Sequence, residues 1–302
     1  MLRFLMIAML LVVGATAGKA GPAQDCDQTA DPDRAIRGCS RFIKTTNNKK
    51  HQAIGYNRRG AAYVKKGQLD RAIADFTTAI QKNPRYAEYY YNRGVVYDAK
   101  RQYDRAIADY TKAIQINPRY ATAYGNRGVV YDAKRQYDRA IADHTKAIEI
   151  NPRDAEYYYN RGVVYYKKGQ LDRAIADFTK AIQVNPRLAV AYYNRGVAYG
   201  QKGQLDRAIA DFTKTIQINP RYAVAYYNRG WAYGKKGQPD RAIADYTKEI
   251  EINPRYANAY YNRAVVYRKK GQRDRAIADF RKAHALGDKD ARADLKRLGV
   301  KP

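Results

Sequence analysis

The hydrophobic pattern of this chain repeats every 34 residues over most of its length. Within one period, apolar or small residues recur at intervals of three and four, a break follows, and the same intervals return. Such intervals place residues on one face of an α-helix, so each period predicts two helices joined by a turn. A proline near the end of each period fixes its length, at Pro84, Pro118, Pro152, Pro186, Pro220 and Pro254. A sustained period of this size is typical of a stacked-repeat solenoid.

Seven repeats follow from this spacing, over residues 53–86, 87–120, 121–154, 155–188, 189–222, 223–256 and 257–290. Positions are counted as places from the first residue of a repeat. In the fifth repeat, Gly196 at place 8 and Ala208 at place 20 are small enough for the two helices to approach closely, and Phe212 at place 24 fills the space beside them. Gly203 can end the first helix with a positive φ, and Pro220 stops the second helix because proline lacks the N–H donor.

These residues resemble the tetratricopeptide repeat, whose signature has small or aromatic residues at places 4, 8, 11, 20, 24 and 27 and proline at place 32. The resemblance covers residues 53–290. It implies an all-α fold, a right-handed superhelical solenoid of antiparallel helix pairs, in which the first helices line a concave face that binds peptides or partner helices. It implies no particular partner. The dicarboxylate clamp with which some members grip chaperone peptides is absent as a set, because tyrosine mostly occupies place 5 and valine place 9.

The N-terminus combines a basic residue, an apolar run and a stretch of small residues. Arg3 precedes the apolar run 4–13, and the small residues 14–17 follow. This order predicts a secretory signal peptide over residues 1–17, cleaved after Ala17, with an uncleaved anchor as the alternative. The apolar run is short for a membrane span. We therefore expect a periplasmic or secreted protein with no transmembrane segment after cleavage.

We predict that the segments at both ends of the repeats cap the solenoid. The chain's two cysteines, Cys26 and Cys39, lie in residues 18–52, and an isolated pair in an exported chain predicts a disulfide, with two free thiols as the alternative. Residues 33–44 align with the second helix of a repeat, so we expect residues 18–52 to form a disulfide-bearing N-terminal cap. Residues 291–302 are predicted to be a C-terminal capping helix, which a solenoid needs to cover its last apolar face.

The candidate partner-binding residues occupy places 5, 6 and 9 of the first helices. Place 6 is asparagine in six repeats, at Asn92, Asn126, Asn160, Asn194, Asn228 and Asn262. An asparagine ladder can donate to and accept from a peptide main chain, and the resemblance implies that role; alternatively, each amide bonds to the neighbouring repeat or faces water. Place 5 adds an aromatic floor of Tyr91, Tyr159, Tyr193, Tyr227 and Tyr261. Trp231, at place 9 of the sixth repeat, is the best hot-spot candidate, unless it fills a gap between adjacent first helices.

Place 7 departs from the family pattern, which usually has leucine there. It is arginine in every repeat, at Arg59, Arg93, Arg127, Arg161, Arg195, Arg229 and Arg263. We expect each guanidinium to pair with an aspartate such as those at place 23, and this structural ladder is favoured over ligand binding because it adjoins the core in every repeat. Glu249, at the normally small place 27, is expected to pair with Arg263 of the following repeat.

Charge limits the partners. The chain has 57 Lys and Arg against 29 Asp and Glu, a formal net charge of +28. The fifth repeat alone has five cations against two aspartates, 5 − 2 = +3. Such a field attracts acidic proteins, anionic envelope polymers or lipid headgroups, whereas nucleic acid is not expected for an exported chain. The alternative is a solvated basic face without a function.

The sequence predicts a protein that is not an enzyme. Ser40 is the single serine, and His51, His144 and His284 share no ligand spacing, so no catalytic triad, metal site or cofactor is expected. His144 at place 24 is expected to face the core. We therefore predict a protein–protein interaction scaffold of the cell envelope that holds an acidic segment in a basic, Tyr/Asn-lined concave groove. The alternatives are an adaptor for an anionic envelope polymer or membrane surface through the basic outer face, and an accessory subunit of an enzyme complex.

Overall fold

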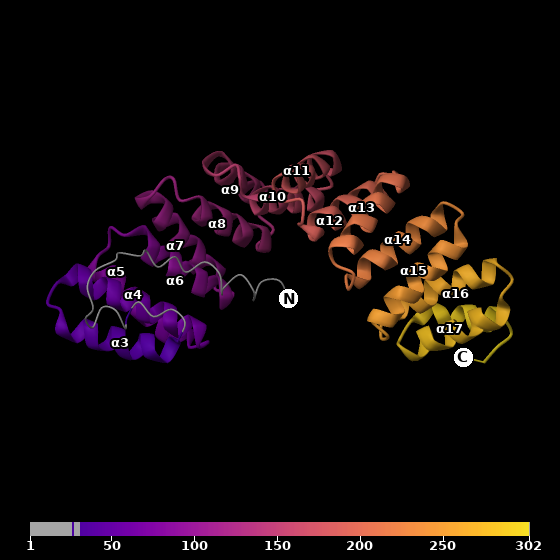
Figure 1. Ribbon diagram of the computed structural model, residues 1–302, viewed down its shortest axis with the longest axis horizontal. Helices are drawn as coiled ribbons and strands as arrows, with labels where there is room; N and C mark the ends of the chain where they lie inside the picture. Colours follow the sequence, from indigo (N-terminus) through magenta and orange to yellow (C-terminus); the bar gives the residue numbers. More distant parts are fainter. Residues whose placement is uncertain (1–25, 27–30, 302) are drawn as a thin grey trace. The chain divides into compact units, whose positions relative to one another are not determined.

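The computed structural model describes residue 26 and residues 31–301, and this part of the chain is an all-α solenoid of consecutive helix pairs without strands (Figure 1). The predicted signal peptide, residues 1–17, lies outside the described residues. The chain divides between Pro152 and Arg153 into two compact units. In each unit, even-numbered helices are the first helices of repeats and odd-numbered helices are the second. The predicted fold class is confirmed.

The first unit contains α3 and three complete helix pairs. Each second helix packs against its own first helix and, up to α7, against the first helix of the next repeat, which buries a continuous core. The described helices are α3 (Pro32–Thr45), α4 (Lys49–Lys65), α5 (Leu69–Lys82), α6 (Ala87–Ala99), α7 (Tyr103–Ile116), α8 (Ala121–Ala133) and α9 (Tyr137–Ile150).

The second unit contains four helix pairs and a final short helix, which packs against α17 as the next first helix would. Its helices are α10 (Ala155–Lys167), α11 (Leu171–Val184), α12 (Ala189–Gln201), α13 (Leu205–Ile218), α14 (Ala223–Lys235), α15 (Pro239–Ile252), α16 (Ala257–Lys269), α17 (Arg273–Ala285) and α18 (Lys289–Arg297). Leu295 of α18 is completely buried against the apolar end of this unit.

The small residue at place 8 allows the two helices of a pair to approach, as predicted. A Cβ built on Gly196 would lie 2.8 Å from Cε1 of Phe212, so any larger side chain would have to displace the ring. The second helix then ends at Asn219, whose side chain accepts a hydrogen bond from the backbone N–H of Arg221 at 3.1 Å. Pro220 between them supplies no donor for a further turn of helix.

The turn inside each helix pair needs a left-handed residue at place 15. Gly203 has φ 72° there, as expected, and a Cβ on it would meet nothing within 4 Å. The second and third repeats instead have Arg101 and Arg135, with φ of 57° and 58°. A residue with a Cβ is strained in this region.

Replacing Arg101 with glycine is therefore expected to stabilise the first unit by about 1 kcal/mol, because glycine relieves the left-handed strain but also gains freedom in the unfolded chain. Urea unfolding followed by circular dichroism measures the change. Gly203→Arg is the reciprocal control and should lose a similar amount. Unchanged or lower stability of Arg101→Gly would show that the Arg101 side chain makes a compensating contact.

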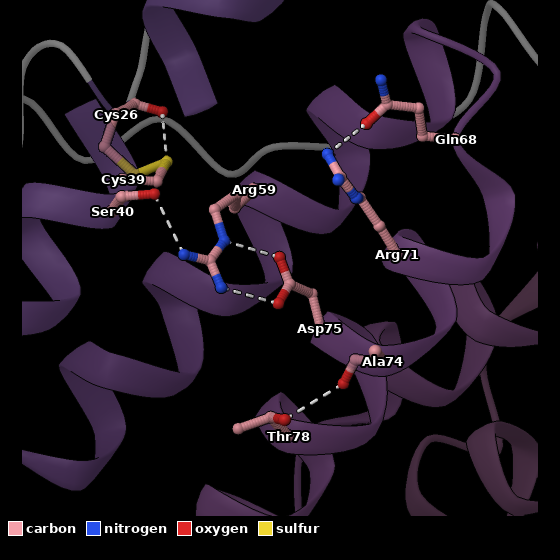
Figure 2. Close-up of polar contacts among 9 residues, drawn as sticks. All are labelled: Cys26, Cys39, Ser40, Arg59, Gln68, Arg71, Ala74, Asp75 and Thr78. Carbon is pink, nitrogen blue, oxygen red and sulfur yellow. Dashed lines mark hydrogen bonds and ion pairs between the residues drawn. A yellow bond between two sulfur atoms is a disulfide. The ribbon is translucent and has the colours of Figure 1, made fainter. Parts of the chain in front are cut away.

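The N-terminal segment joins the first unit through α3. Cys26 and Cys39 form the predicted disulfide, and both are buried (Figure 2). Ser40 of α3 accepts a hydrogen bond from Nη1 of Arg59 at 3.0 Å, which is the bond that a threonine of the preceding second helix accepts in later repeats. Helix α3 thus stands where a second helix of a preceding repeat would stand.

Candidate functional site

The arginines at place 7 form the predicted structural ladder. In the fifth repeat, Nε and Nη2 of Arg195 donate to the two carboxylate oxygens of Asp211, each at 2.8 Å, and Nη1 donates to Thr179 Oγ1 of the preceding second helix at 2.9 Å. Figure 2 shows the equivalent fork of Arg59 on Asp75. The same two-pronged pair forms in all seven repeats, with Asp75, Asp109, Asp143, Asp177, Asp211, Asp245 and Asp279.

The ladder also orders the aromatic rings around it. The guanidinium of Arg195 lies 5.7 Å from the ring centroid of Tyr192 and 5.9 Å from that of Tyr199. Arg207 lies 5.5 Å from the same Tyr199 ring. Burial acts to lower the pKa of Arg195, but the hydrogen bonds to Asp211 outweigh it and raise the pKa above its usual value. The place 7 arginines are therefore committed to the scaffold and are not available to hold a ligand.

Place 5 tyrosines and place 6 asparagines form hydrogen-bonded rungs between successive first helices. The Nδ2 of Asn228 donates to the hydroxyl of Tyr193, 35 residues earlier, at 2.8 Å. Equivalent rungs join Asn126 to Tyr91, Asn194 to Tyr159 and Asn262 to Tyr227, at 2.7 to 3.0 Å. Of the alternatives open at the sequence level, the bond to the neighbouring repeat is the one that these four amides make.

The rungs differ in their access to a partner. Tyr91 and Asn92 are buried, and Asn92 donates to Asn57 Oδ1 at 2.9 Å, so these two candidates do not present a surface. Place 5 of the third repeat is Gly125, which has no hydroxyl to offer Asn160. The asparagines from Asn126 onward and the tyrosines from Tyr159 onward are half-buried. The second unit therefore has the more accessible part of the candidate site.

Trp231 is both packed and exposed. Its indole lies over Gly200 of α12, where an added Cβ would be 3.5 Å from the ring, and Lys235 Nζ lies 5.9 Å from the ring centroid. The side chain nevertheless keeps 37% of its surface exposed. Val224, seven residues earlier on α14, is 39% exposed and lies on the same side of the helix. Together, Val224 and Trp231 form what we call the α14 apolar ledge.

Helix α18 continues the rungs with a different chemistry, which sequence reasoning missed. Tyr261 donates its hydroxyl hydrogen to Asp294 Oδ2 at 3.0 Å, in place of the asparagine that a further repeat would supply. Arg268 donates to Asp294 Oδ1 at 2.6 Å. Burial acts to raise the pKa of Asp294, but these bonds outweigh it and lower the pKa. The sequence feature that could have predicted this bond is Asp294 itself, an acidic residue in the predicted C-terminal cap. It follows Tyr261 by 33 residues, which is close to the 35 residues that separate the two members of a rung.

The expected pairing of Glu249 with Arg263 is wrong. Arg263 donates hydrogen bonds from Nε and Nη2 to Asp279, and from Nη1 to Thr247 Oγ1 at 2.8 Å. All three nitrogens therefore bond residues other than Glu249. Glu249 is completely buried, and neither of its carboxylate oxygens has a hydrogen-bond partner among the residues that the structure describes. Burial raises its pKa from 4.5 to about 7, while the nearby Asn253 amide offsets part of the rise.

His144 faces the core, as predicted, and lies against Gly128, where a Cβ would be 2.8 Å from Cε1 of the imidazole. Among the described residues, no cluster of three or more His, Cys, Asp or Glu side chains could hold a metal ion. The candidate site is the surface of the first helices, where the half-buried rungs and the partly exposed Trp231 lie.

Models of the tetratricopeptide repeat match most of the chain. One of them matches residues 87–120, 155–188, 189–222, 223–256 and 257–289. The chain belongs to the tetratricopeptide repeat family. Two further tetratricopeptide repeat models match residues 60–100 and 133–169, and residues 109–142. No curated protein sequence matches the chain.

Solved tetratricopeptide repeat structures are similar to this chain over more than half of its length. The protein YrrB, described as having an unusual peptide-binding site, is 30% identical with a TM-score of 0.53, over 61% of this chain and 95% of YrrB. The protein MamA is 30% identical with a TM-score of 0.52, over 55% of this chain and 96% of its own. A tetratricopeptide repeat protein from Parabacteroides merdae is 25% identical with a TM-score of 0.59, over 82% of this chain and 98% of its own.

Tetratricopeptide repeat proteins generally mediate interactions between proteins, and their fold is typically a binding scaffold without catalytic activity. Within the part of the chain that the structure describes, no helix is long and apolar enough to span a membrane. The disulfide between Cys26 and Cys39 is consistent with a location outside the cytoplasm.

Proposed function

We propose that this chain is a protein-binding scaffold that holds an extended partner segment on the first-helix face of its second unit, with the α14 apolar ledge as the anchor. The observation that carries this proposal is the exposure of Trp231, since burying a large exposed indole is a strong source of binding energy. Val224 extends the apolar contact by two helical turns. The peptide-binding site named for YrrB supports the same use of this fold.

The half-buried rungs would fix the partner's main chain beside that anchor. In a rung, Asn228 uses one amide N–H on Tyr193, which leaves its Oδ1 as an acceptor and the tyrosine O–H as a donor. Burial raises the pKa of Tyr193 to about 12, so the hydroxyl keeps its proton at physiological pH. One donor and one acceptor per rung match the C=O and N–H of an extended peptide. The bond to the neighbouring repeat is therefore compatible with peptide binding, because it leaves part of each asparagine amide for a ligand.

Charge near the ledge favours an acidic partner in the cell envelope. Lys235 lies beside Trp231, and Lys269 on the next first helix is also exposed. A partner segment with an apolar side chain flanked by carboxylates would satisfy both the indole and the lysines. The signal-like N-terminus and the disulfide support a periplasmic or secreted location.

Trp231→Ala is expected to abolish capture of a discrete protein in a crosslinked pull-down from the native envelope fraction at moderate salt. A hot-spot residue contributes at least about 2 kcal/mol, roughly a 30-fold loss of affinity. Val184→Ala is the matched control, because Val184 is similarly exposed, at 38%, but lies on the second helix α11. Asn194→Ala with Asn228→Ala should weaken capture when Trp231 is left in place.

Two results would contradict this proposal. One is equal recovery of the same partner with wild type and Trp231→Ala. The other is equal loss with Val184→Ala, which would place the contact on another face. Circular dichroism of each variant keeps a folding defect separate from a binding defect.

A further inference from the structure

The excess positive charge of the fifth repeat lies on its second helix, α13, and on the turn that follows it. In the fifth repeat, Arg195 is paired with Asp211, and Lys202 is paired with Asp172 of the preceding repeat. Asp206, the remaining acidic residue of the repeat, accepts from Lys236 of the next repeat. Both acidic side chains of the fifth repeat are therefore already paired with a cation. The cations without an acidic partner among the described residues are Arg207, Lys214 and Arg221, which equal the net charge of +3 on this repeat.

We call these three cations a stripe: Arg207 and Lys214 lie on one outward-facing side of α13, and Arg221 lies in the turn that follows it. They occupy places 19, 26 and 33, spaced by seven residues, and all three are exposed. Ala210 and Gln217 between them are exposed as well, which shows that this side of α13 faces solvent. The pattern recurs in the neighbouring repeats of the second unit, with Arg173, Lys180 and Arg187 from α11 onward and Arg241, Lys248 and Arg255 from α15 onward. Lys248 differs in having a partner, Glu251 Oε2 at 2.7 Å.

The stripes lie next to each other. Arg195 contacts Thr179 of α11 and Asp211 of α13 with one guanidinium, so the arginine ladder holds successive second helices together. Within α13, the seven residues from Arg207 to Lys214 correspond to about 10 Å along the helix axis. This spacing slightly exceeds the Debye length at physiological salt, about 8 Å, so the repulsion between adjacent cations of a stripe is largely screened.

The arginine at the start of each stripe is held in place. Nη1 of Arg207 donates to Gln204 Oε1 at 3.0 Å, and its guanidinium stacks on Tyr199. Arg173 and Arg241 make the same hydrogen bond to Gln170 and Gln238. A guanidinium that is already oriented loses less entropy when it binds a carboxylate or phosphate group.

We propose that the second-helix face of the second unit, defined by places 19, 26 and 33 of α11, α13 and α15 and the turns that follow them, binds a linear polymer with repeated anionic groups. A flexible polyanion can place successive charges over successive stripes. Membrane docking is less favoured, because this face has too little exposed apolar surface to insert into a lipid interface. Of the exposed large apolar residues in the described part of the chain, Val184 is the one that lies on a second helix.

The test measures binding of two fluorescent polyanions, polyglutamate and inorganic polyphosphate, by anisotropy over a range of salt concentrations. The variant Arg207→Gln/Lys214→Gln/Arg221→Gln removes one stripe. The control Lys202→Gln/Lys236→Gln/Lys270→Gln removes the same net charge from lysines that are paired with aspartates. The stripe variant should weaken binding about tenfold and reduce the slope of log affinity against log salt by about 2, with a much smaller effect of the control.

The results separate the sources of binding. Preference for polyphosphate or polyglutamate identifies phosphate or carboxylate as the anionic group. Equal losses from stripe and control variants would overturn the proposal, because net charge alone would then explain binding. Binding to vesicles of phosphatidylglycerol with neither polymer bound would also overturn it. Trp231→Ala should leave polymer binding unchanged, so this proposal and the proposed protein-binding function fail or hold separately.

Discussion

Arg195→Ala is expected to destabilise the second unit by about 3–5 kcal/mol, because it leaves the Asp211 carboxylate buried without its partner. Asp211 is only 5% exposed, and Arg195 supplies both of its close charged hydrogen bonds. The change also removes the bond to Thr179 that links two successive second helices. Urea unfolding and the amide exchange of α11 and α13 measure the loss. Exchange should quicken first in these helices, since each repeat is stabilised mainly by its neighbours.

A double variant distinguishes the cost of the stranded charge from the loss of packing. Arg195→Leu with Asp211→Ala removes both charges and restores the leucine that the family usually has at place 7. Its stability should recover most of the loss. Lys202→Ala breaks an exposed ion pair with Asp172 and is expected to cost at most about 1 kcal/mol. A loss of that small size for Arg195→Ala would refute the role assigned to the ladder.

Glu249→Ala is expected to stabilise the protein at pH 8 and not at pH 5. The buried Glu249 carboxyl has its pKa raised to about 7, against 4.5 in the unfolded chain. Folding favours the protonated, neutral carboxyl of Glu249. The contribution of this group to the free energy of unfolding is therefore complete below about pH 4.5 and is lost as pH rises to about 7. The loss amounts to about 3 kcal/mol above neutral pH. Alanine, which stands at place 27 in five of the seven repeats, removes this penalty.

Urea unfolding of wild type and variant at pH 5 and pH 8 measures the difference. Glu249→Gln keeps the shape of the side chain without its charge and should reproduce the pH dependence of the alanine variant. Glu251→Ala, at an exposed position two residues later, is the control and should shift stability by a similar small amount at both pH values. A loss of stability at pH 8 for Glu249→Ala would show that the carboxylate has a favourable partner after all.

Features carried by a single repeat were predictable from the sequence. The hairpin followed from helical spacing, and the close approach of Gly196 to Phe212 followed from their residue types. The pairing of Arg195 with Asp211 was also predictable, because a charge beside the core requires a partner and an aspartate recurs at the same place in every repeat. The disulfide followed from a pair of cysteines in a chain whose sequence predicts an export signal.

Features that join one repeat to the next needed the structure. Asn228 could have faced solvent, a ligand or a neighbour, and only the stacking of α14 on α12 brings it to the Tyr193 hydroxyl. The same stacking leaves Glu249 without a partner and exposes part of Trp231. Periodicity determines which face of a helix a residue occupies, and residue chemistry determines what it can bind. The distances between side chains of different repeats depend on how the helices pack, and that is what the tertiary structure decided.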